Sequence, residues 1–200
     1  ACEKKYDFQE LERKLYIIRK KIENQAAKEQ LNDFYISSLS SKSVIYKGMF
    51  LAENIADFYP DLMDERFTSR FAIFHQRFST NTFPSWELAQ PFRVIAHNGE
   101  INTLKGNVNW MKTHEAGMES DLFDNIDDIK PIIKANNSDT ASLDAAFELL
   151  VRGGRDLPIA KMMLIPEAWS KKSKIISKAH RDMYNYCLLY TSDAADDLRG

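Results

Sequence analysis

Cysteine is scarce in this chain, and its scarcity excludes several classes of protein. The 200 residues include two cysteines, Cys2 and Cys187, which lie at opposite ends of the sequence. Two such distant cysteines provide neither a disulfide framework nor a Cys-x-x-Cys metal site, and their use suits a reducing compartment. We therefore expect a cytoplasmic protein that binds no metal in this segment.

The chain also lacks an excess of charge and a long apolar run. Lys plus Arg number 27 against 29 for Asp plus Glu, so no net field attracts nucleic acid or an acidic membrane surface. No apolar run approaches the roughly 18 residues of a membrane span, and no charged-then-apolar leader opens the sequence. A hydrophobic content of 44% fits one globular domain. We expect a small-molecule or protein partner, and we expect neither nucleic acid nor membrane.

The clearest helical periodicity lies in residues 7–31. Asp7 followed by Glu10 resembles a capping box and predicts the start of the helix. Apolar residues at three-four spacing predict the face that packs inward: Phe8, Leu11, Leu15, Ile18 and Ile22. The basic residues between them are expected on a solvated face: Arg13, Lys14, Arg19, Lys20 and Lys21.

The rest of the chain mixes predicted strands and helices without a repeat. β-prone runs predict a hairpin of residues 34–39 and 43–49, followed by strands at 71–77 and 93–97. Helices are predicted at 51–59, 102–115 and 138–152, with an acidic surface loop between the last two. Because no regular βαβ alternation is present, the pattern favours an α+β layered domain.

Two polar clusters begin where apolar, strand-like runs end, at residues 75–82 and 97–100. Arg77 could offer its planar fork to a ligand carboxylate, or could pair with a local acid, which spacing alone favours. The Asn98-Gly99 pair is by default a turn, and its functional alternative is an oxyanion hole. His75 and His97 have no third metal ligand at a suitable spacing, so each is interpreted as a buried or turn-supporting histidine.

The residues Ser138-Asp139-Thr140 open the last predicted helix, where Ser or Asp normally caps the first turn. A carboxylate at this point could also meet a ligand ammonium, and the two roles are compatible. No nucleophile emerges from the pattern: Cys2 follows Ala1 and precedes no glycine-rich turn. The serines of the polar clusters lack the Gly-x-Ser-x-Gly elbow.

A long stretch resembles a known family. The run FAIFHQRFSTNTFPSWELAQPFRVIAHNGEINTLKGNVNWMK is similar to the class II glutamine amidotransferase domain of glutamate synthase large subunits. The resemblance extends back through LERKLYIIRKKIEN and forward through NNSDTASLDAAFELLVRGGR. The His-Asn-Gly motif is common to all class II amidotransferases. The longer motifs Arg-Phe-Ser-Thr-Asn-Thr and Gly-Glu-Ile-Asn-Thr-Leu-Lys-Gly-Asn resemble glutamate synthase specifically. The resemblance implies an N-terminal-nucleophile hydrolase fold, here a partial four-layer αββα sandwich.

The resemblance also implies roles for individual residues in binding L-glutamine and releasing its ammonia. Arg77 would bind the α-carboxylate and Asp139 the α-ammonium. Asn98 and Gly99 would form the oxyanion hole, and Thr80 matches a further substrate contact. These assignments suit a zwitterionic amide, which needs a cation, an anion and an oxyanion stabiliser at fixed separations.

Three departures from the family accompany the resemblance. The family's nucleophile, an N-terminal cysteine followed by glycine, is missing, so we expect the chain alone to lack glutaminase activity. Residues 1–187 are expected to be an interior part of the domain, and residues 188–200 to be a non-native tail. The FMN and the iron–sulfur cluster of the family belong to other parts of the parent polypeptide, whose remaining synthase domains are expected partners of this segment. A separate small NAD(P)H-oxidising subunit could be a further partner. If the source is a photosynthetic eukaryote, we expect the protein in a plastid.

Two other functions remain open at this point. The first is an amidotransferase-like module that has lost its nucleophile and binds glutamine through Arg77, Asp139 and Asn98. Calorimetry with glutamine tests this possibility. The second is a class II amidotransferase of sugar-phosphate or nucleotide-precursor metabolism, which the long motifs disfavour.

Overall fold

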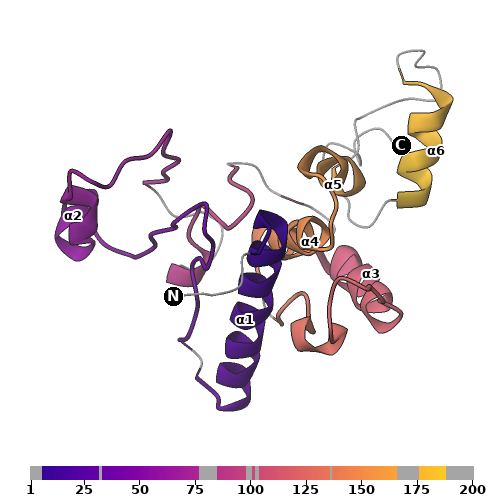
Figure 1. Ribbon diagram of the computed structural model, residues 1–200, viewed down its shortest axis with the longest axis horizontal. Helices are drawn as coiled ribbons and strands as arrows, with labels where there is room; N and C mark the ends of the chain where they lie inside the picture. The colour runs from indigo at the N-terminus through magenta and orange to yellow at the C-terminus, as the bar shows by residue number, and fades with distance from the viewer. Residues whose placement is uncertain are drawn as a thin grey trace.

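The structure of the chain is a computed structural model, and it describes residues 6–31, 33–76, 85–97, 101, 104–135, 137–165 and 176–187. Figure 1 shows these residues spread along one long axis, with α2 at one end and α6 at the other. The helices α1, α3, α4 and α5 lie between these ends. No helix of these residues combines the length and apolar character needed to cross a membrane.

Helix α1, Phe8–Lys28, starts and ends where local signals place it. The Asp7 carboxylate caps the first turn and accepts a hydrogen bond from the Glu10 amide at 3.0 Å. The acid in the first turn and Lys28 in the last turn both complement the helix dipole. The helix predicted for residues 7–31 is therefore confirmed.

The direction in which α1 faces differs from the prediction. Phe8, Ile18 and Ile22 of the expected inward stripe are 40%, 47% and 43% exposed. The buried side of the helix is mostly polar and consists of Glu12, Tyr16, Arg19, Lys20, Glu23 and Ala26. The expectation of a solvated basic face is thus wrong for Arg19 and Lys20, because long-range ion pairs and carbonyl acceptors neutralise the cost of burying them.

The remaining helices include three predicted ones and others that the sequence analysis did not predict. They are η1 (Ala52–Asn54), α2 (Ile55–Phe58), η2 (Pro60–Met63), η3 (Trp86–Leu88), α3 (Leu104–Ala116), η4 (Ile126–Ile129), α4 (Asp139–Arg152), α5 (Leu157–Leu164) and α6 (Lys178–Cys187). The helices expected at 51–59, 102–115 and 138–152 are confirmed. Helix α4 is capped by Ser138 and ends at Gly153, and Gly154 adopts a φ of 87° that favours glycine. Pro158 occupies the first turn of α5, where it fits without loss of a hydrogen bond.

The hydrophobic core lies around α4 and joins side chains from α1, α3 and α5. Ile129, Ala160 and Leu164 are fully buried in it, and Leu143, Ala146 and Phe147 of α4 are nearly so. Tyr16 of α1 reaches this core and meets Phe123 edge to face. The core therefore holds α4 rigidly between its neighbours.

The predicted strands are not formed in the residues that the structure describes, which are irregular at 34–39, 43–49, 71–76 and 93–97. Strands require backbone ladders, and here several backbone N–H groups donate to side chains instead. The Ile45 amide donates to the Ser38 hydroxyl, and the Ser41 amide donates to Glu12. The amides of residues 93–95 donate to Asp144. The helical part of the α+β prediction is confirmed, whereas its sheet is not seen within these ranges.

Candidate functional site

The first turn of α4 lies at the centre of the candidate site. Ser138 caps it by accepting a hydrogen bond from the Ala141 amide at 3.1 Å, as its position in the sequence predicts. Asp139 accepts from the Thr140 amide through Oδ1, at 2.7 Å, and from the Ile101 amide through Oδ2, at 2.9 Å. The Asp139 carboxylate is therefore fixed in direction by backbone donors from two segments.

Thr140 connects the same turn to His97. The Thr140 hydroxyl lies 2.9 Å from Nε2 of His97, which is half-buried. The interpretation of His97 as a supporting residue agrees with this contact. His75 is exposed, so of the two roles expected for it a buried position is wrong, while a supporting role at a turn stays a prediction. The described residues contain no group of three His, Cys, Asp or Glu side chains that could hold a metal ion.

A hollow of about 490 Å³ brings the two polar clusters of the sequence together. His75 and Gln76 are the first two residues of one cluster, and His97 is the first residue of the other. All three line this hollow, along with Ile73, Phe74, Gln90, Pro91 and Ala96. The first residues of the two clusters therefore lie at one place in the structure.

Only part of the predicted site falls within the described residues. Asp139 is described and lies at the start of α4. Arg77, Thr80, Asn98 and Gly99 lie outside the described residues, as does the tail at 188–200. The residue before Arg77 and the residue before Asn98 both line the hollow.

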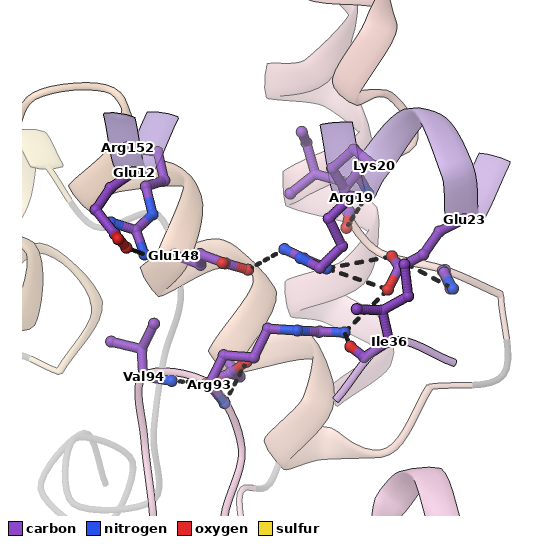
Figure 2. A network of polar contacts seen from close by, with 12 residues as sticks. Glu12, Arg19, Lys20, Glu23, Ile36, Arg93, Val94, Glu148 and Arg152 are labelled. Atoms are coloured by element: carbon purple, nitrogen blue, oxygen red, sulfur yellow. Dashed lines mark hydrogen bonds and ion pairs between the residues drawn. The ribbon is translucent and has the colours of Figure 1, made fainter. Parts of the chain in front are cut away.

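A network of buried charges lies behind this region, between α1 and α4 (Figure 2). Arg19 contacts Glu23 at 3.2 Å and Glu148 at 2.5 Å, and its side chain is only 3% exposed. Arg93 donates to Glu23 at 2.9 Å and to the Ile36 carbonyl. The network thereby connects α1, α4 and the segment around Ile36 to Arg93, which lies four residues before His97.

These charges line a partly open cavity of about 240 Å³. Burial alone would raise the pKa of the Glu23 carboxyl, but the attraction of Arg19, Arg93, Lys134 and Lys20 lowers it below its usual value. Burial lowers the pKa of Lys20 to about 8, although the Lys20 ammonium still donates to the Pro131 carbonyl at 2.5 Å. The cavity's polar groups therefore largely satisfy one another.

Asp144 is a buried acid that the sequence analysis did not single out. It is 1% exposed, and it accepts hydrogen bonds from the amides of Arg93, Val94 and Ile95. Burial, followed by the nearby charge of Glu148, raises the pKa of the Asp144 carboxyl to about 6. An acid on the otherwise apolar side of a predicted helix, next to Leu143 and Phe147, was the signal that could have revealed it.

The comparisons with known proteins define the class to which the chain belongs. Residues 1–193 match the family described as glutamine amidotransferases class-II. The chain therefore belongs to the class II glutamine amidotransferases. Membership implies the N-terminal-nucleophile hydrolase fold, of which the described residues contribute helices.

The relatives within this class are glutamate synthases. The chain is 58% identical to the glutamate synthase (NADPH) large chain of Azospirillum brasilense over 180 residues, which cover 90% of this chain and 12% of that protein. It is 51% identical to the corresponding large chain of Bacillus subtilis over 176 residues, which cover 88% of this chain and 11% of that protein. The ferredoxin-dependent glutamate synthase of Pyropia yezoensis is 46% identical over 181 residues, covering 88% of this chain and 12% of that protein. The chain thus spans about one-eighth of the length of these relatives.

Proposed function

We propose that this chain supplies the glutamine-holding part of an amidotransferase domain in a glutamate synthase large chain. In that role, Arg77 binds the α-carboxylate of L-glutamine and Asp139 binds its α-ammonium. Asn98 and Gly99 face the side-chain carbonyl, and Thr80 adds a polar contact. The proposal rests on family membership together with one observation, the attachment of both sides of the Asn98-Gly99 segment to the first turn of α4.

Chain connectivity supports this placement. In the sequence, Asn98 and Gly99 stand between His97 and Ile101, both of which the structure describes. The His97 side chain contacts Thr140, and the Ile101 amide contacts Asp139, on the other side of the motif. Gln76, which precedes Arg77 in the sequence, lines the same hollow as His97. Under the proposal, a cation, an anion and an amide donor meet one small zwitterion.

The chemistry of the parent reaction assigns these residues to binding and charge stabilisation. An attack on the glutamine side-chain carbonyl places negative charge on its oxygen, and the Asn98 amide and the Gly99 N–H would stabilise that charge. Neither Cys2 nor Cys187 is followed by glycine, so the family's Cys-Gly nucleophile is not among these residues. In the complete enzyme, hydrolysis of the glutamine side-chain amide releases ammonia. We propose that the rest of the polypeptide uses this ammonia for the reductive amination of 2-oxoglutarate to glutamate.

The cofactors of that second reaction do not fit this segment. An iron–sulfur cluster is commonly held by about four cysteine thiolates, and the chain has two cysteines at its ends. The FMN and the cluster are proposed to belong to other parts of the parent chain, and a small NAD(P)H-oxidising subunit is proposed as a separate partner of that chain. The four-layer αββα arrangement is proposed for the complete domain on the same basis.

Glutamine binding to the purified chain tests the proposal, because binding requires no nucleophile. Isothermal titration should detect L-glutamine, and Arg77→Lys should weaken the affinity about tenfold or more, since lysine lacks the bidentate fork. Arg70→Lys, at an exposed position seven residues upstream, is the matched control and should leave the affinity unchanged. Absence of glutamine binding, or equal affinities for Arg77→Lys and the parent chain, would contradict the proposal.

A further inference from the structure

We propose that Asp144 is a positioning residue that fixes the chain entering the His97-Asn98-Gly99 motif against α4. The proposal rests on the proposed function, because the motif matters only if it forms the oxyanion hole. Asp144 itself is not a predicted ligand of glutamine, and it acts through the backbone of residues 93–95.

The contacts of Asp144 are those of an anchor. Its Oδ1 accepts from the Val94 amide at 2.7 Å and from the Ile95 amide at 3.1 Å, and its Oδ2 accepts from the Arg93 amide at 3.3 Å. Successive backbone N–H groups that converge in this way form an anion-binding concavity, which here is filled by the protein's own carboxylate. Both oxygens of the side chain are thereby committed to one short segment.

The same helix holds both sides of the motif. Asp144 binds residues 93–95 before it, Thr140 contacts His97, and Asp139 accepts from Ile101 after it. Thr140 and Asp144 are four residues apart and so share a face of α4. Because the α4 backbone rises about 1.5 Å per residue, these contacts fix the two sides of the motif at a set separation.

Helix α4 is firm enough to serve this purpose. Ser142 is 0% exposed, Ala146 is 1% exposed, and the Ser142 hydroxyl donates to the Ser138 carbonyl at 2.8 Å. A displacement of residues 93–95 is therefore not absorbed by α4 and passes along the chain toward Asn98. Misplacement of a reacting group by about 1 Å is enough to reduce catalysis strongly.

Charged groups surround Asp144 on several elements. Glu148 lies one turn further along α4, Arg93 belongs to the anchored segment, and Lys47 and Tyr35 come from the segment that packs against them. Burial and Glu148 raise the pKa of Asp144 to about 6, while Arg93 and the Val94 and Ile95 amides oppose that rise. Protonation below this pH replaces an acceptor lone pair with an O–H donor, so the anchor weakens as the pH falls.

Amide hydrogen exchange measured by NMR on the full chain tests the inference directly. Asp144→Asn should lower the protection factors of the Arg93 to Ile95 amides about tenfold or more, the effect expected when hydrogen bonds to a charged group are lost. It should also weaken glutamine binding about fivefold or more. The matched control is Asp156→Asn, since Asp156 precedes α5, is exposed and makes no capping hydrogen bond.

A second measurement keeps the inference falsifiable if Asp144→Asn does not fold. In the unmodified chain, the protection factors of residues 93–95 should fall as the pH decreases from about 7.5 to 5, after correction for the intrinsic exchange rate. Protection factors that stay constant over this range would overturn the inference. So would unchanged affinity and exchange in a folded Asp144→Asn variant.

The two proposals fail in different ways. If the unmodified chain does not bind glutamine, the proposed function fails, while the exchange data still decide whether Asp144 anchors residues 93–95. If the unmodified chain binds glutamine and folded Asp144→Asn binds it equally well, the positioning role fails and the proposed function stands.

Discussion

Residues 49–76 and the body formed by α1 and α4 differ in the kind of side chain that each buries. In the body, charged side chains such as Arg19, Glu23 and Glu148 are 2%, 3% and 5% exposed. In residues 49–76, called here the arm, no residue is buried. Its exposed apolar side chains are Met49, Leu51, Ile55, Phe58, Met63, Phe67, Phe71, Ile73 and Phe74.

The arm is held together by contacts between its own aromatic rings. Phe50, Phe58 and Tyr59 pack against one another with ring centroids 4.9 to 6.2 Å apart. The Tyr59 hydroxyl donates to the Lys47 carbonyl at 2.6 Å, where the arm joins the body. Apolar composition therefore does not identify the interior of the described residues. The presence of hydrogen-bonding and charged partners for polar side chains identifies it better.

The largest effect should come from breaking the charge network in the body. Glu23→Gln removes the acid that Arg19, Arg93 and Lys134 contact at 3.2, 2.9 and 3.5 Å. It leaves buried cations without compensation, so we expect a loss of about 3–5 kcal/mol in the free energy of unfolding. Urea denaturation followed by circular dichroism measures this loss.

The control for this change lies on the same helix. Glu10 pairs with Lys14 at 3.9 Å on an exposed face, so Glu10→Gln should cost less than about 0.5 kcal/mol. Equal stabilities for the two variants would mean that the buried network contributes nothing.

A smaller, pH-dependent effect is expected at the joint between the arm and the body. Lys47 is 5% exposed, lies 4.2 Å from the Phe92 ring centroid and donates to the Glu87 carbonyl. Burial, followed by the charge of Arg93, lowers its pKa to about 7. The folded state therefore binds fewer protons than the unfolded state between pH 7 and about 10.5, and this lysine destabilises the fold less as the pH rises.

Lys47→Met removes this dependence. Relative to that of the unmodified chain, the variant's free energy of unfolding should be greatest near pH 7 and should decline by about 3 kcal/mol from there to about pH 9, at roughly 1.4 kcal/mol per pH unit. Urea midpoints at several pH values measure the difference. Lys161→Met, at an exposed position on α5, should show no such trend, and a flat difference for Lys47→Met would contradict the burial argument.

The smallest effect is expected within the arm. Phe74 is 85% exposed, so Phe74→Ala should change the free energy of unfolding by no more than about 0.5 kcal/mol. Phe147 is 6% exposed in the core, and Phe147→Ala should cost about 3–5 kcal/mol. If the two variants lose similar stability, Phe74 is covered by other residues in solution and the contrast between arm and body does not hold.

Local signals in the sequence predict the helices because the forces that end a helix are local. Asp7 and Ser138 cap α1 and α4 through hydrogen bonds to residues three positions away, and Gly153 ends α4. The helix α5 was missed, although Asp156 and Pro158 form a recognisable start. The position of Asp139 at the start of α4 could be predicted from the sequence as well, whereas its proposed role in binding glutamine came from the family resemblance.

Long-range partners could not be predicted in the same way. The burial of Arg19 depends on Glu148, which is 129 residues away, and no periodicity within α1 indicates it. The β-prone segment at 93–97 does not form a strand because its amides donate to Asp144, some 50 residues further on. The motif around Asn98 was found from family resemblance, because an Asn-Gly pair alone is an ordinary turn.

The polar interface between α1 and α4 has a consequence for how the chain selects one arrangement. Apolar surfaces tolerate small slips, because neighbouring aliphatic side chains can replace one another with little loss. A slip of α1 would instead separate Arg19 from Glu148 and leave unlike charges unmatched in the interior. The ion pairs therefore favour a single register between the two helices. They stabilise the interface less than well-packed apolar side chains of similar volume could.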